Sequence, residues 1–249
     1  MRKSSLYQHS HNPQDIAERL AQGPRYSYLR DFIYGAIDGT ITTFAVVAGV
    51  AGAHLSSKVV IVLGMANLIA DGFSMAISNF FGTRSEREQL DMARKIEHEH
   101  IKNDPEGEKE EIRQIFAKKG FSGKNLDSAV DVITSDIERW VSIMLQDEIG
   151  MKLHPASPWR AGLSTFTAFA LAGAVPLISY IINLFSPQFI GEPFIGSAIL
   201  TGITFFMIGS LKGPFVLKSW WQSGLETFCA GMAASLIAYY IGYSLRSLV

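Results

Sequence analysis

Residues 161–211 read AGLSTFTAFALAGAVPLISYIINLFSPQFIGEPFIGSAILTGITFFMIGSL and contain a single charged side chain, Glu192. Residues 219–245 form a second run of this kind, in which Glu226 is the one charge. A helix of about 20 mainly apolar residues crosses the hydrocarbon core of a bilayer. Runs of this length therefore predict membrane spans and exclude a single water-soluble globule.

The charges missing from these runs are concentrated between residues 86 and 148, which hold 16 of the 23 Asp and Glu residues of the 249-residue chain. The formal net charge is −1, which argues against a protein that binds nucleic acid. Cys229 is the one cysteine, so an intrachain disulfide framework and a thiolate metal cluster are both excluded.

Hydropathy predicts a membrane protein with five spans. The fold is expected to be all-α, because no segment shows the alternation of apolar and polar residues typical of a strand. The predicted spans are residues 32–53, 59–82, 161–185, 194–211 and 224–245. Pro176 lies inside the third span and is expected to kink it. A short amphipathic helix is also expected at 13–21, capped by Asn12.

The basic residues predict the orientation in the membrane. If the N-terminus is cytosolic, 20 of the 22 Lys and Arg residues lie on the cytosolic side, and only Lys58 and Arg246 lie outside. The positive-inside rule favours this arrangement. The expected parts are a cytosolic N-terminal arm (1–31), the first two spans (32–83), a cytosolic helical domain (84–152) and the last three spans (153–249).

The segment 84–152 is predicted to form three helices. The first continues the second span without a break, since residues 83–102 contain no Gly or Pro. The second begins after Asp104, a typical N-cap, and ends at Gly120. The third covers about 126–149 and is expected to break near Thr134 and Ser135.

Two carboxylates lie inside the first two spans, Asp38 and Asp71. A charge buried in lipid is costly, so each must face a water-filled path, a cation or a polar partner. The alternative is a hydrogen bond to a nearby Thr, Ser or Asn that serves helix packing. Asp31 and Asp38 lie seven residues apart on one helical stripe, beside a second small and polar stripe that includes Thr42.

The second span carries four functional groups at intervals of four residues along one face. They are Asn67, Asp71, Met75 and Asn79. Carboxylate and amide oxygens with a thioether sulfur suit a first-row divalent cation of intermediate softness. The pattern therefore favours a cation path along the first two spans.

Three same-face pairs of possible metal ligands occur in the predicted cytosolic domain. They are Glu97 with His100, Glu108 with Glu111, and Met144 with Glu148. A helical hairpin near Pro105 would bring the first two pairs together, giving a site suited to Fe²⁺, Mn²⁺, Co²⁺ or Zn²⁺ and too poor in soft ligands for Cu(I). The alternative is a solvated acidic helix face, which is what most charge runs are.

Several motifs resemble those of the vacuolar iron transporter family. They are YGAIDGTITTFA from Tyr34, ADGFSMA from Ala70, TRSE from Thr83, PxxExxEI from Pro105, WVSIMLQDEIG from Trp140 and GLET from Gly224. The resemblance extends over nearly the whole chain from about Tyr26. It implies a homodimer in the lipid bilayer that exports Fe²⁺, and often Mn²⁺ and other divalent ions, from the cytosol in exchange for protons, with no prosthetic group.

The resemblance also implies roles for particular residues. Asp31 and Asp38 match the acidic residues of the family's first helix, and Met75 matches its pore methionine, in a path at the two-fold axis. The matching ligands of the cytosolic metal-binding domain are Glu97, Glu108, Glu111, Met144 and Glu148.

The sequence departs from the family pattern at three positions. His100 replaces the second Glu of the first pair, and Leu145 replaces a second adjacent Met. Asn67 stands where an acidic residue is expected, while Asp71 lies one turn away. These departures leave the metal stoichiometry and the preference between Fe²⁺ and Mn²⁺ open.

A proton-coupled metal exporter is therefore the expected function, and a membrane-anchored metal sensor or buffer is the alternative. Asp38 and Asp71 argue against a sensor, which needs no charge inside lipid. An enzyme is not expected, because di-iron helical bundles need two Glu-x-x-His motifs and this chain has one. The short chain without a targeting tail favours a bacterial inner membrane over a vacuolar one.

Overall fold

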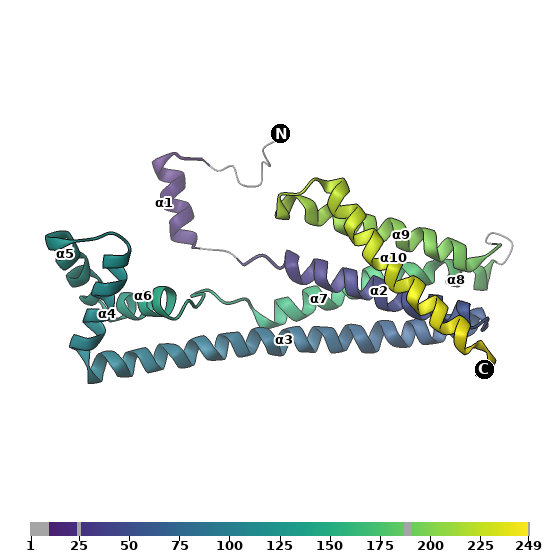
Figure 1. Ribbon diagram of the computed structural model, residues 1–249, viewed down its shortest axis with the longest axis horizontal. Coiled ribbons are helices and arrows are strands. Elements are labelled where there is room, and N and C mark those ends of the chain that lie inside the picture. The colour runs from purple at the N-terminus through teal and green to yellow at the C-terminus, as the bar shows by residue number, and fades with distance from the viewer. Residues whose placement is uncertain (1–9, 24–25, 187–190, 249) are drawn as a thin grey trace. The chain divides into compact units, whose positions relative to one another are not determined.

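The computed structural model describes residues 10–23, 26–186 and 191–248, and within these ranges the fold is all-α, as predicted (Figure 1). The helices are α1 (Pro13–Gln22), α2 (Leu29–Gly52), α3 (Ser57–Asn103), α4 (Pro105–Lys118), α5 (Gly123–Thr134), α6 (Ile137–Ile143), the π-helical turn η2 (Met144–Glu148), α7 (Pro158–Gly173), α8 (Val175–Phe185), α9 (Pro193–Lys212), the 3₁₀ turn η3 (Gly213–Val216), α10 (Trp220–Leu245) and the 3₁₀ turn η4 (Arg246–Leu248).

Four helices are long and apolar enough to cross a membrane: α2, α3, α9 and α10. The pair α7 and α8 meets the same criteria together and is bent by 45°, so it supplies a fifth span when it is counted as one. The bend lies at Ala174, two residues before Pro176, whose ring and missing N–H disfavour a continuous helix. The predicted five spans, with a kink at Pro176, are confirmed.

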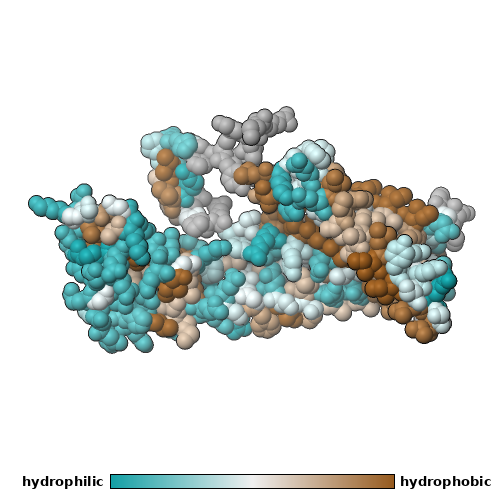
Figure 2. Space-filling model, viewed as in Figure 1, coloured by the Kyte–Doolittle hydropathy of each residue, from teal (hydrophilic) through white to brown (hydrophobic). Residues whose placement is uncertain are grey.

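The chain divides into two compact units. One, the spanning unit, contains Ser27–Phe80 and the residues from Pro158 onward, together with α1; the other, the insert, contains Phe81–Ser157. Helix α3 runs unbroken through the boundary, as residues 83–102 predicted. Figure 2 shows mainly hydrophobic side chains over α9 and α10 and mainly hydrophilic ones over α4 to α6.

Close packing in the spanning unit depends on small residues at the contact of α2 with α7. A Cβ added to Gly39 would lie 2.5 Å from the carbonyl oxygen of Phe169, and one added to Gly35 would overlap the backbone of Thr165. Helices in lipid gain little from apolar burial, so such backbone contact is a main source of their association. The Gly35 and Gly39 pair therefore fixes how α2 lies against α7.

The insert has a core of its own. It is formed by the buried side chains of Leu90, Ile101, Ile112, Val130, Trp140, Val141, Met144 and Leu145. Helix α4 begins as predicted, since the Asp104 carboxylate accepts a hydrogen bond from the Gly107 amide at 3.0 Å. The predicted third stretch begins three residues earlier than expected, at Gly123, and breaks at Ser135 as expected.

Helix α1 is present where an amphipathic helix was predicted, one residue longer than expected. Asn12 occupies the N-cap position, but its side chain makes no capping hydrogen bond within the described residues, so that detail of the prediction is wrong. Its backbone amide instead donates to the Ser10 hydroxyl at 3.1 Å. Pro13 in the first turn is the remaining local signal for the start of this helix.

Candidate metal centre and polar path

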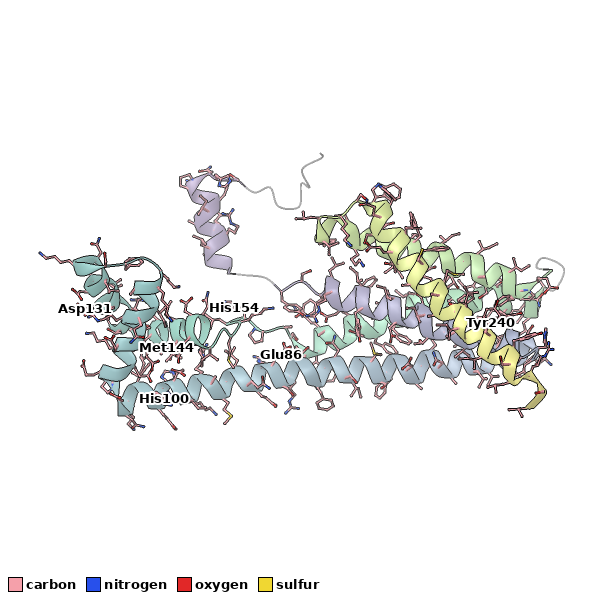
Figure 3. All side chains as sticks on the ribbon, in the orientation of Figure 1. Glu86, His100, Asp131, Met144, His154 and Tyr240 are labelled. Atoms are coloured by element: carbon pink, nitrogen blue, oxygen red, sulfur yellow. The ribbon has the colours of Figure 1, made fainter. Side chains whose placement is uncertain are left out.

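Three of the predicted metal ligands meet in the insert. Glu97 and His100 lie one turn apart on α3, and Glu108 lies in the first turns of α4 after the reversal at Asp104. One ligand atom from each of the three side chains lies within 4.8 Å of the other two, and His100 Nδ1 lies 3.5 Å from Glu108 Oε1. The predicted helical hairpin thus brings the two pairs together. Figure 3 labels His100 at the end of α3.

The two glutamates of this group are buried, which distinguishes the group from a solvated acidic face. Glu97 is 4% exposed and Glu108 is 7% exposed, whereas the neighbouring Glu99 and Glu106 are exposed. Among the described residues, no hydrogen-bond partner is found for Oε2 of Glu97 or Oε2 of Glu108. A buried carboxylate oxygen without a partner is costly, and a divalent cation is a partner that would satisfy both oxygens.

Burial and crowding shift the acidity of these carboxyls. Burial, followed by the nearby Glu111 and Glu97 charges, raises the pKa of Glu108 to about 7, although the His100 charge opposes this shift. Burial also raises the pKa of Glu97. The Glu148 side chain remains solvent-exposed, but the part of it that packs against the insert is desolvated, which raises its pKa. The charges of Glu111 and Glu97 and a hydrogen bond with Glu111 contribute in the same direction. Crowded carboxyls with raised pKa values are typical of functional sites.

Glu111 and Glu148 are exposed and border the buried group, as their charge interactions with Glu97 and Glu108 indicate. Met144, four residues before Glu148, begins the π-helical turn η2, in which the Ile149 amide donates to the Met144 carbonyl at 3.2 Å. Short π-helical turns occur often at functional sites. The Met144 side chain is fully buried in the core of the insert together with Leu145.

If this group binds metal, the raised pKa of Glu108 should make the binding depend on pH. Metal ligands must be deprotonated, so the affinity of the purified chain for a divalent ion should fall as the pH drops through about 7. For one group of this pKa, we expect a loss of about tenfold between pH 8 and pH 6. Calorimetric titration at several pH values measures the midpoint of this loss.

His100 should determine the pH at which the loss of metal affinity reaches its midpoint. Its charge lowers the pKa of Glu97 and Glu108, so His100→Glu should move the midpoint to higher pH. His98, two residues away, contacts Glu138 at 3.2 Å and serves as the control for a change of imidazole on the same helix. Equal midpoints in His100→Glu, His98→Gln and the unmodified chain would show that His100 does not act on the site.

The predicted path residues lie on α2 and α3 in the spanning unit. Asn67 Nδ2 lies 3.4 Å from Thr42 Oγ1, and the charges of Asp38 and Asp71 interact with each other. Both aspartates are partly buried. Within the described chain, no hydrogen bond from Thr, Ser or Asn reaches either carboxylate, so the packing alternative lacks the contact it requires.

Asp31 has a different environment. Its side chain is 7% exposed, and Asn79 Nδ2 donates to its Oδ1 at 3.0 Å. Asn79 follows Met75 by one turn on the face that the sequence singled out, but its contact with Asp31 was not predicted. Met75 lies partly buried on that same face of α3.

The chain is similar to known proteins over most of its length. The model of the VIT family matches residues 29–243 of the chain. The chain is 32% identical to vacuolar iron transporter 1 of Eucalyptus grandis, over 88% of this chain and 87% of that protein. It is 31% identical to the vacuolar iron transporter of Toxoplasma gondii, over 89% of this chain and 76% of that protein. Vacuolar iron transporter 1 of Arabidopsis thaliana is 30% identical, over 85% and 83% of the two chains.

Proposed function

Because the chain belongs to the VIT family, we propose that it exports Fe²⁺, and also Mn²⁺ and other first-row divalent ions, from the cytosol in exchange for protons. Membership makes the chain an integral membrane protein that carries metal ions across a membrane and not an enzyme. The proposal includes three finer points. The metal is exchanged for protons, several first-row divalent metals are carried, and the path lies at the interface of a homodimer.

The observation that carries the proposal is the pair of carboxylates inside the spans. Asp38 on α2 and Asp71 on α3 are partly buried, interact electrostatically and have no hydrogen-bond partner among the described residues. A carboxylate in this setting is stabilised by a cation or by a proton, and antiport needs a site that binds each in turn. We propose that Asp31, Asp38, Thr42, Asn67, Asp71 and Met75 line this path.

We propose that the insert, within residues 84–152, lies in the cytosol and captures metal before transport. Glu97, His100 and Glu108 form its centre, and Glu111, Met144 and Glu148 complete the set of ligands. The N-terminal arm lies on the same side of the membrane in this arrangement. The positions of 20 of the 22 basic residues support that orientation.

Uptake into sealed vesicles tests this function against a membrane-anchored sensor or buffer. The purified chain is reconstituted in liposomes with an acidic interior, and Fe²⁺ is added outside under anoxic conditions. The proposal predicts metal accumulation together with release of protons, and loss of accumulation when an ionophore removes the pH gradient. A sensor would bind metal in proportion to its own amount and accumulate none, with or without the gradient.

A further inference from the structure

Asn79 joins three helices of the spanning unit through its amide group. Its Nδ2 donates to Asp31 Oδ1 on α2 at 3.0 Å and to Thr165 Oγ1 on α7 at 2.8 Å. The Thr165 hydroxyl donates its own proton to the Ala161 carbonyl at 3.1 Å, so its oxygen accepts from Asn79. The side chains at this junction therefore have a definite order of donors and acceptors.

The two oxygens of the Asp31 carboxylate differ in their hydrogen bonding at this junction. Oδ1 accepts the Asn79 hydrogen bond, whereas the buried Oδ2 has no hydrogen-bond partner within the described part of the chain. No Lys, Arg or His of the described residues forms an ion pair with Asp31 either. A buried carboxylate oxygen without a partner is costly, and a proton or a cation that meets it removes this cost.

The chemistry of Asn suits this position better than that of a basic residue. A Lys or Arg would neutralise Asp31 and occupy the place of a cation. The Asn amide is uncharged, so it fixes one oxygen and leaves the negative charge available. It also removes the rotational freedom of the carboxylate, because Thr165 holds the amide itself in place.

We propose that Asn79 is the positioning residue of Asp31, which it holds with Oδ2 directed at the metal ion that enters the path. The inference rests on the proposed transport function. A role in helix packing alone is the competing explanation, since Asn79 also ties α3 to α7. The two explanations differ in whether the hydrogen bond to Asp31 or the one to Thr165 matters for the metal.

Initial rates of Fe²⁺ uptake into proteoliposomes, measured over a range of Fe²⁺ concentrations, separate these explanations. Asn79→Leu removes both hydrogen bonds, and Thr165→Val removes only the bond that does not reach Asp31. A hydrogen bond to a charged group is worth a factor of about ten or more, so Asn79→Leu should raise the half-saturating concentration by about tenfold. Its maximal rate should change much less, and Thr165→Val should stay within about twofold of the unmodified chain in both quantities.

A third variant, Asn79→Ser, addresses the case in which Asn79→Leu does not fold, because small polar residues are common where helices pack in lipid. Its shorter side chain lacks the amide that donates to Asp31 and Thr165, while the Asp31 carboxylate stays in place. The proposal predicts that this variant folds, judged by a monodisperse elution profile, and has a raised half-saturating concentration. Packing alone predicts kinetics like those of the unmodified chain, and that result would overturn the inference.

Three further outcomes are informative. If the unmodified chain takes up Fe²⁺ and Asn79→Leu has the same half-saturating concentration, the inference fails while the proposed function stands. The inference also fails if Thr165→Val is impaired as strongly as Asn79→Leu. If the unmodified chain takes up no Fe²⁺, the proposed function fails and the inference fails with it.

Discussion

Asp38→Asn should reduce pH-driven metal uptake to the level of liposomes without protein. Asn preserves the size of the side chain but cannot carry the charge that alternately binds a cation and a proton. Asp38 lies two turns from Asp31 on α2, about 10 Å along the helix axis, so the two carboxylates form successive positions on one face. Loss of the Asp38 carboxylate, which lies further into the span than Asp31, should interrupt the path.

Asp71→Asn is the matched control, because Asp71 is also a partly buried carboxylate within the spans and interacts with Asp38. We expect Asp71→Asn to retain measurable uptake with an altered dependence on pH. Both variants should elute as the unmodified chain does and bind metal in the insert with unchanged affinity. Strong pH-driven uptake by Asp38→Asn would refute the mechanism and assign the exchange to Asp71 or Asp31.

The membrane architecture could be predicted from the sequence because lipid imposes simple rules on composition. Long apolar runs with few charges located the spans, and Pro176 located the bend between α7 and α8. The continuity of α3 followed from the absence of Gly and Pro in residues 83–102. Predictions of capping hydrogen bonds were less reliable. The Asp104 side chain caps α4 as predicted, whereas the Asn12 side chain does not cap α1.

The grouping of Glu97, His100 and Glu108 could be predicted from the sequence, but the burial around these side chains could not. Helical spacing paired Glu97 with His100, and the turn before Pro105 brought Glu108 to them. Spacing gives no information on burial, which comes from the core of the insert packed behind these side chains. The raised pKa of Glu108 is a consequence of that burial and was therefore not predictable.

The junction at Asn79 could not be predicted, because it depends on contacts between distant segments. Asn79 is 48 residues from Asp31 and 86 residues from Thr165 along the chain. Periodicity identifies a face of a helix but not the residue that the face meets on its neighbour. The depth at which α2 packs on α7, set by Gly35 and Gly39, determines that Thr165 and Asp31 reach the same amide.

The double variant Glu97→Gln with Glu108→Gln should lower the affinity of the full chain for Fe²⁺ or Mn²⁺ by about a hundredfold or more. Loss of a residue that only supports a metal ligand costs about ten- to a hundredfold, and here two proposed ligands are lost. Without metal, the variant should unfold at a higher temperature than the unmodified chain, because two crowded, buried carboxylates are replaced by neutral amides.

Glu99→Gln with Glu106→Gln is the control for the general negative charge of this region. It removes the same charge from the same two helices, at positions that are exposed. Added metal should raise the unfolding temperature of this control as much as that of the unmodified chain, and should hardly change that of the Glu97 and Glu108 variant. Equal metal affinities in the two double variants would mean that the acidic surface as a whole attracts the ion. A loss confined to the buried pair would instead locate metal capture at the hairpin of α3 and α4, one turn from His100.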